Sequence, residues 1–303
     1  MSEMIQVLRS SVQTWECDRM GHLNVRHYFG KSGEGVAYFG SLLGLSPREL
    51  DRRGWLLAPR DQHVRFLREL RPGAPYTASA GVLEVSSEGL KILTLLRHGV
   101  DGPPAATLTT DYLLCDRDAR TPRPLPDEVR QRALVHRCEL PEYAAPRGLE
   151  PTAPAPEPTL QEAEVRGLVP AFLGRVRPEL CDASGHLAPE GHMAAVSDGV
   201  THFFLHTERP QPPGIGGAAL EYRFVYRNPI AAGDFLSVRS GYAEVSEKTM
   251  RIAHQLFDAV SGRCVATSEA VVVNFDLEAR RAVALTPEQR AQLQAHVIAD
   301  LRI

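Results

Sequence analysis

The sequence has little cysteine, no long apolar run and no concentration of charge of one sign. Its five cysteines are odd in number and form no CxxC pair, which argues against a disulfide framework and a structural zinc site. No apolar stretch reaches the roughly 18 residues of a membrane span. Residues 1–9 lack the charged start and apolar core of a secretory signal. We therefore expect a cytoplasmic protein with no membrane partner.

The charge is nearly balanced, with a formal net charge of -3 over 303 residues. No basic stripe with interleaved aromatic residues occurs, so we expect no nucleic-acid partner. Charged residues make up 23% and hydrophobic residues 43% of the chain, as in ordinary globular proteins. The length suits one large domain or two domains of ordinary size.

An internal repeat indicates the architecture. Residues 17–23 read Cys-Asp-Arg-Met-Gly-His-Leu, and residues 181–187 read Cys-Asp-Ala-Ser-Gly-His-Leu, with identity at five of seven positions. Further matches follow in the same order at an offset of 160. They pair Gly73 with Gly233, Val85-Ser86 with Val245-Ser246, Ala106-Thr107 with Ala266-Thr267, and Ala119-Arg120 with Ala279-Arg280. Chance does not easily produce several matches in one order, so the chain is a tandem of two similar halves.

A proline-rich stretch separates the halves. Residues 150–158 read Glu-Pro-Thr-Ala-Pro-Ala-Pro-Glu-Pro, which can form neither a helix nor a central strand. We expect domains at 1–136 and 162–303, joined by an extended, semi-rigid linker at 137–161.

Each half has the same predicted order of elements: a short strand, the repeated turn, a helix and several strands. The helices are expected at residues 24–43 and 189–206. The strands are expected at His63–Leu70, Tyr76–Val85, Lys91–His98, Ala105–Cys115, Leu220–Tyr226, Phe235–Val245, Arg251–Asp258 and Cys264–Asp276. Residues 220–226 alternate like a half-buried strand. One helix followed by an antiparallel sheet, twice, predicts an α+β fold.

The first repeat resembles a known family signature. Asp18-x-x-Gly21-His22-Leu23-Asn24, followed by Tyr28 and Glu34, is similar to the 4-hydroxybenzoyl-CoA thioesterase family of hotdog proteins. The resemblance implies a tandem double hotdog, in which each half is a curved antiparallel sheet wrapped around a central helix. It also implies an intramolecular pseudo-dimer with composite sites, and leaves a further homo-oligomer open. Val25 and Glu16 depart from the family pattern, which often has Asn and Asp there.

The resemblance implies an acyl-CoA thioesterase that needs no cofactor or metal. Asp18 then corresponds to the catalytic carboxylate, and Glu34 is a candidate second acid or base. The amide of Val25 or of its neighbour, at the positive end of the helix, could hold the oxyanion. Other candidate substrate-binding residues are Gly21, His22, Asn24, Tyr28 and His63. From the residues alone, Asp18 could instead stabilise a turn, His22 could be a buried structural histidine, and Glu34 could be a solvated helix charge.

The second copy keeps Asp182 and His186 and places Asp198 where the first has Glu34. It has Ala188, Pro189 and His192 where the first has Asn24, Val25 and Tyr28. We therefore expect the first site to be the catalytically active one. Asp198, His202 and His206 share a helix face at a spacing that could bind metal. Because their first-half equivalents Glu34, Tyr38 and Leu42 are not ligands, we expect a polar pocket wall or surface instead.

Two other functions compete with thioester hydrolysis: a hotdog enoyl-CoA hydratase or dehydratase, and a non-catalytic acyl-CoA-binding module. The Gly-Asp-x-Asn-Pro context of the hydratases is missing, and the first half keeps its carboxylates. Candidate arginines for the CoA phosphates are Arg65, Arg68, Arg71, Arg97, Arg223, Arg227 and Arg251.

Overall fold

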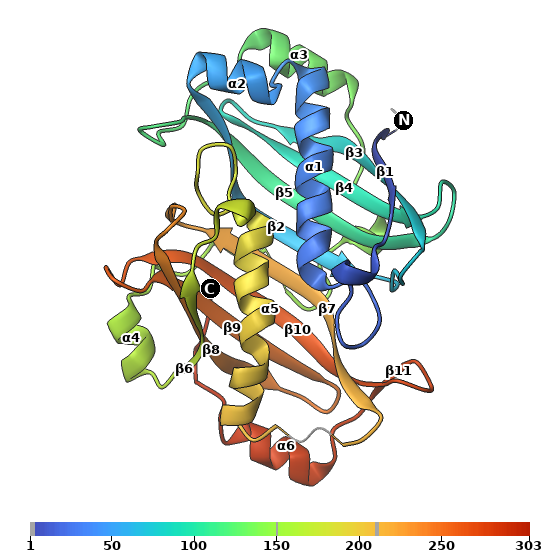
Figure 1. Cartoon of the computed structure of the whole chain (residues 1–303), viewed down its shortest axis with the longest axis vertical. Coiled ribbons are helices and arrows are strands. Elements are labelled where there is room, and N and C mark those ends of the chain that lie inside the picture. Colours follow the sequence, from blue (N-terminus) through green and yellow to red (C-terminus); the bar gives the residue numbers. More distant parts are fainter. Residues whose placement is uncertain (1–3, 150, 210–211) are drawn as a thin grey trace. The chain divides into compact units, whose positions relative to one another are not determined.

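A computed structural model describes residues 4–149, 151–209 and 212–303 of the chain. These residues form two compact units, which divide between Ala145 and Pro146 (Figure 1). Glu150, the first residue of the proline-rich stretch, lies outside the described residues. Every helix in the described parts is too short or too polar to cross a bilayer.

The first unit is an antiparallel sheet with one long helix on its inner face. The sheet order is β1-β3-β4-β5-β2. Its elements are β1 (Ile5–Ser11), the 3-10 helix η1 (Thr14–Glu16), α1 (Val25–Leu43), α2 (Pro47–Arg53), β2 (Trp55–Phe66), β3 (Pro75–Val85), β4 (Gly89–His98), β5 (Pro104–Asp116), α3 (Asp127–Val135) and η2 (Glu142–Ala144). In Figure 1, α1 lies across this sheet.

The second unit repeats this plan, with sheet order β7-β10-β9-β8-β6 and a short β11 on β10. Its elements are α4 (Leu160–Val165), β6 (Val169–Arg175), η3 (Pro178–Leu180), α5 (Pro189–His206), β7 (Ile215–Tyr226), β8 (Phe235–Val245), β9 (Thr249–Asp258), β10 (Cys264–Asp276), β11 (Arg281–Val283) and α6 (Pro287–Gln294). One helix against an antiparallel sheet in each half confirms the α+β tandem hotdog predicted from the repeat.

The long helices begin and end where their sequences predict. Asn24 caps α1 by accepting a hydrogen bond from the Arg26 amide at 3.0 Å. Gly44 ends the helix in the left-handed conformation, with φ of 92°. Between these ends, the buried side chains recur with helical spacing and include Tyr28 and Phe39, so one stripe of α1 faces the sheet.

Two of the predicted strands, those at His63–Leu70 and Leu220–Tyr226, had wrong bounds. The first strand of the main sheet runs from Trp55 to Phe66, whereas the sequence suggested His63–Leu70. Pro59 sits at a bulge that interrupts the alternation, and the strand ends at Phe66 because the amides of Leu67 and Arg68 both turn to the Ala105 carbonyl. Strand β7 also begins earlier than predicted, at Ile215, because Gly216 and Gly217 disguise its start.

The alternation in residues 220–226 suggested a half-buried strand, but residues 221–226 of β7 are all buried. The reason is a covering segment, residues 146–149 and 151–159, bound along the outer face of this sheet. Glu221 accepts hydrogen bonds from the amides of Arg147 and Gly148, at 3.0 and 2.8 Å. Arg223 donates to the Thr152 carbonyl at 2.8 Å. The proline-rich stretch is therefore extended but bound to the sheet, and it is no free spacer.

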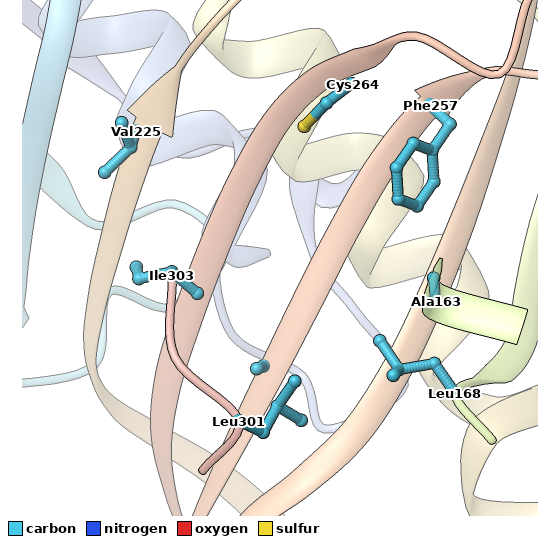
Figure 2. Packing of buried hydrophobic residues seen from close by; sticks show 8 residues of the cluster. Ala163, Leu168, Val225, Phe257, Cys264, Leu301 and Ile303 are labelled. Carbon is cyan, nitrogen blue, oxygen red and sulfur yellow. The ribbon is translucent and has the colours of Figure 1, made fainter. Parts of the chain in front are cut away.

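A second apolar core fills the rest of this outer face. Leu301 and Ile303 at the chain end lie against β7 and β9, and Ala163 and Leu168 close the cluster from α4 and the residues after it (Figure 2). Burying these side chains on a face that would otherwise be wet adds hydrophobic stabilisation to the second unit. In the first unit a smaller cluster around Leu93 and Ala144 does the same.

The repeat continues further than the sequence matches suggested. Val82 of β3 pairs in parallel with Arg137, and Tyr242 of β8 pairs in parallel with Val297. The two pairs are related by the same offset of 160. Helices α3 and α6, which precede these bridges, are therefore equivalent elements although their sequences have diverged.

Candidate active site

The repeated motif forms a tight loop, residues 17–23, which we call the first loop. Cys17 and Leu23 pair as an antiparallel bridge, and the Asp18 amide donates to the His22 carbonyl at 3.0 Å. Gly21 has φ of +74°, and a Cβ there would meet no atom within 4 Å. Glycine is therefore required by the backbone conformation and not by lack of space.

The two oxygens of the Asp18 carboxylate have different partners. Oδ1 accepts the Met20 amide at 2.8 Å, which stabilises the turn. Oδ2 lies 3.4 Å from Nδ1 of His22, and the Asp18 side chain is 25% exposed. The carboxylate can therefore hold the turn with one oxygen and meet a reactant with the other.

His22 lies between two carboxylates. Its Nε2 is 3.8 Å from Oε1 of Glu69, whose other oxygen is 3.9 Å from Nη2 of Arg71. Sequence reasoning missed Glu69, because it follows β2 in a loop without periodicity. The Leu23 amide donates to the Leu70 carbonyl at 2.7 Å, and this bond brings Glu69 beside the first loop.

The start of α1 leaves one backbone donor available. The Asn24 amide donates to Glu16, the Arg26 amide to the Asn24 side chain, and the His27 amide to the Asn24 carbonyl. The Val25 amide, the remaining orphan of this helix end, has no partner among the described residues. An N–H group at the positive end of a helix suits a developing oxyanion.

Tyr28 anchors the helix to the end of β2. Its ring packs edge-on against Phe66 with centroids 5.2 Å apart, and only 4% of the residue is exposed. Burial, aided by the negative charge of Asp18, raises the pKa of the Tyr28 hydroxyl, so it stays protonated at neutral pH.

Glu34 and His63 lie on other elements than the Asp18–His22–Glu69 group. Glu34 lies on the exposed face of α1, ten residues after the cap. His63 is buried on β2, and the alternation from Phe66, which faces α1, places it on the outer face of the sheet.

The second loop, residues 181–187, has the same backbone but a different side-chain network. Oδ1 of Asp182 accepts the Ser184 amide at 2.8 Å and the Ser184 hydroxyl at 2.6 Å. Ser184 Oγ also lies 3.2 Å from Nδ1 of His186. Ile230 takes the place of Leu70, and Pro229 stands where the first half has Glu69, so the second loop lacks that carboxylate.

The second helix also differs at its start. Ala188 offers no side-chain cap, and Pro189 at the first helical position has no N–H group. His192 replaces Tyr28 and packs on Tyr226 in the same edge-on way, at 5.1 Å. Burial lowers the pKa of His192 to about 4, so it is neutral at pH 7. The second half thus keeps the turn and loses the helix-end donor.

Asp198 and His202 line a pocket of about 490 Å³ between α5 and strands β6 and β8. Ser237 and Arg239 form its other polar wall. Throughout the described residues, no group of three or more His, Cys, Asp or Glu side chains is arranged to hold a metal ion.

Comparisons with known proteins agree with this architecture. A family model described as the thioesterase-like superfamily matches residues 12–133 and 176–293. A structure assigned as an oleoyl thioesterase from Lactobacillus plantarum is similar, with TM-score 0.69, 12% identity, and coverage of 90% of this chain and 96% of that one. An acyl-ACP thioesterase from Bacteroides thetaiotaomicron has TM-score 0.65, 13% identity, and coverage of 88% and 96%.

A 12:0-ACP thioesterase from Umbellularia californica is similar to the same degree, with TM-score 0.65, 13% identity, and coverage of 88% and 93%. No curated protein matches the chain. At these identities the solved structures bear on the fold alone, whereas the family model covers most of the chain. The chain belongs to the thioesterase-like superfamily of hotdog proteins, a membership that supports thioester hydrolysis.

Proposed function

We propose that this protein is an acyl-CoA thioesterase whose working site is the first loop and the start of α1. The observation that carries the proposal is the pairing of a carboxylate oxygen, Asp18 Oδ2, directed at His22, with an unused helix-end amide at Val25. Thioester hydrolysis needs these two groups: one to activate or deliver the nucleophile, and one to stabilise the oxyanion.

In the proposed reaction, Asp18 accepts a proton from water as the water attacks the thioester carbonyl. The oxyanion receives a hydrogen bond from the Val25 amide. As it collapses, the C–S bond breaks and the CoA thiolate takes the proton back from Asp18, which restores the carboxylate. Direct attack by Asp18 is the alternative route, and it would pass through a mixed anhydride. Hydrolysis in ¹⁸O-water under single-turnover conditions tests for direct attack, because ¹⁸O enters the Asp18 side chain only when water attacks the Asp18 carbonyl of such an anhydride.

His22 has a positioning role in this scheme. Held between Asp18 and Glu69, its imidazole fixes the orientation of the Asp18 carboxylate through the 3.4 Å contact. The equivalent His186 instead contacts Ser184, which hydrogen-bonds to Asp182. The second carboxylate is therefore more fully engaged by its own turn.

The decisive experiment compares Asp18→Asn with Asp182→Asn on a panel of acyl-CoAs, with CoA release followed by a thiol reagent. Asparagine keeps the size and turn-stabilising oxygen but cannot accept the proton. We expect turnover to fall about 100-fold or more in Asp18→Asn and to change little in Asp182→Asn. Near-normal turnover in Asp18→Asn with an intact melting curve would refute the catalytic assignment. A larger loss in Asp182→Asn would assign catalysis to the other half.

A further inference from the structure

Positive charge gathers around the first loop. Arg19 lies in the loop, Arg26 is in the first turn of α1, and Arg68 and Arg71 flank Glu69. Arg19, Arg68 and Arg71 are exposed, and the Arg71 side chain is 65% exposed. We call these four arginines the basic collar.

The second half provides an internal comparison. The bond from Leu23 to Leu70 has its equivalent from Leu187 to Ile230, so the surroundings of the two loops can be matched position by position. The equivalents of the four collar arginines are Ala183, Glu190, Asn228 and Ala231. The collar therefore belongs to the first loop and is no requirement of the hotdog fold.

The helix ends show that Arg26 does not stabilise α1 through the helix dipole. A cation near the start of a helix opposes the helix dipole, whereas an anion there is favourable. The first turn of α1 has Arg26 and no acidic residue, while the first turn of α5 has Glu190. The first half thus keeps a cation where the fold alone would prefer an anion.

An exposed aromatic residue precedes the collar in the sequence. Trp15, in η1 directly before the first loop, is 77% exposed, and its second-half equivalent is Glu179. An indole ring left in water is available for stacking against a planar group. Stacking of a nucleic base on an aromatic side chain is a common way to use such a ring.

The other arginines that the sequence suggested for phosphate contacts are engaged elsewhere. Arg65, Arg97, Arg223 and Arg227 each donate to a backbone carbonyl, and Arg251 pairs with Glu269 and Glu244. Of the original seven candidates, Arg68 and Arg71 remain exposed at the first loop, and both belong to the collar. Arg71 also lies 3.9 Å from Glu69, but its side chain is 65% exposed.

We propose that Trp15 and the basic collar form the binding site for the nucleotide end of CoA, the 3′-phosphorylated adenosine diphosphate. Adenine stacks on Trp15, and the phosphates receive charge-assisted hydrogen bonds from the arginines. An acidic protein carrier would also be attracted by charge, but the exposed indole favours a planar base. The inference rests on the proposed function, which places the thioester at the first loop. It adds the site at which the nucleotide part of CoA binds.

The test compares an acyl-CoA with the same acyl-pantetheine, which lacks the nucleotide. The variants are Arg68→Ala and Trp15→Ala. The control is Arg52→Ala on α2, an arginine 67% exposed at the far end of α1. We expect KM for acyl-CoA to rise about tenfold or more in the two test variants, with kcat and all acyl-pantetheine kinetics unchanged. Equal effects on both substrates would overturn the proposal.

A binding experiment keeps the inference separable from the proposed hydrolysis. Calorimetric titration with adenosine 3′,5′-bisphosphate measures nucleotide affinity without any reaction. We expect the bisphosphate to bind, and its affinity to decrease with added salt and in the variants of the kinetic test. If no thioester is hydrolysed yet the nucleotide binds as described, the proposed function fails and the site stands. Absence of nucleotide binding, or collar variants that impair only an acyl-carrier-protein substrate, would overturn the site.

Discussion

A buried ion pair beneath the first loop offers a quantitative test of the structure. Nζ of Lys31 on α1 lies 2.6 Å from Oε1 of Glu16, and the two side chains are 8% and 14% exposed. Oε2 of Glu16 accepts the Gln13 amide at 2.8 Å, and Lys31 lies 4.9 Å from the centre of the Tyr76 ring. Replacing Lys31 with alanine would leave a buried carboxylate with one partner.

Removing one member of a buried pair costs about 3–5 kcal/mol, because the remaining charge is desolvated without compensation. Glu16 keeps the hydrogen bond from Gln13, so we expect the low end, about 3 kcal/mol, for Lys31→Ala. The second half shows the apolar alternative, with Leu180 and Ala195 at the equivalent positions. The double variant Glu16→Leu/Lys31→Ala should therefore cost less than either single change.

Urea unfolding followed by tryptophan fluorescence measures the effect in the correct unit, because both tryptophans, Trp15 and Trp55, belong to the first unit. Burial alone would raise the pKa of Glu16, but the Gln13 amide and Lys31 outweigh it and lower the pKa. The pair's stabilisation is therefore present above the unfolded-state pKa and is lost as pH falls through the lower folded value. The cost of Lys31→Ala should shrink toward acidic pH.

A cost below about 1 kcal/mol for Lys31→Ala at pH 7 would refute the account of an uncompensated buried charge. The account would also be refuted if Glu16→Leu/Lys31→Ala were as unstable as Lys31→Ala. That result would show that the destabilisation comes from lost packing and not from the unpaired charge.

Two further predictions concern a helix end and a buried histidine. Asn24→Ala removes the cap of α1 and should cost about 1 kcal/mol in the same unfolding assay, whereas an unchanged midpoint would show that the cap bond contributes nothing. In the second unit, burial lowers the pKa of His254 from 6.5 to about 3, so the folded state binds fewer protons than the unfolded state across that window. The free energy of unfolding should therefore decrease as the pH is lowered. At pH 5 this histidine alone should reduce it by about 2 kcal/mol relative to neutral pH. His254→Thr/Ser240→Ala, which imports the first-half pair Thr94 and Ala80, should flatten this dependence in urea unfolding followed by circular dichroism, and a slope equal to wild type would contradict it.

Much of the fold was predictable because the repeat and local chemistry agree. The capping residue Asn24 and the left-handed Gly44 mark the ends of α1, and the helix predicted at 189–206 matches α5. The start of β2 was missed because Pro59 and its bulge break the alternation. The burial of β7 was missed because it depends on a segment some 70 residues earlier in the chain that binds Glu221 and Arg223. Such tertiary cover leaves no local trace in the strand itself.

The candidate site divides in the same way. Asp18, Gly21 and His22 are visible as a motif because a tight turn needs them at fixed spacing. Glu69 is invisible, since only the bond between Leu23 and Leu70 brings it to the loop. Site residues that lie within one local turn can be predicted from a single sequence. Those brought together by contacts between distant segments can be identified only from the structure.

The tandem also limits what the shared motif can prove. Both halves keep Asp, Gly and His, and in both the aspartate Oδ1 accepts an amide two residues on, from Met20 or Ser184. The motif is thus sufficiently explained by the turn, and its presence alone says nothing about chemistry. The informative positions are those that the turn conformation does not constrain and that differ between the two halves. There the first half has Glu69 and a free amide at Val25, and the second has Pro229 and Pro189. Two prolines stand where one half offers a carboxylate and a donor, and this difference, more than the aspartate itself, favours the first loop as the site of hydrolysis.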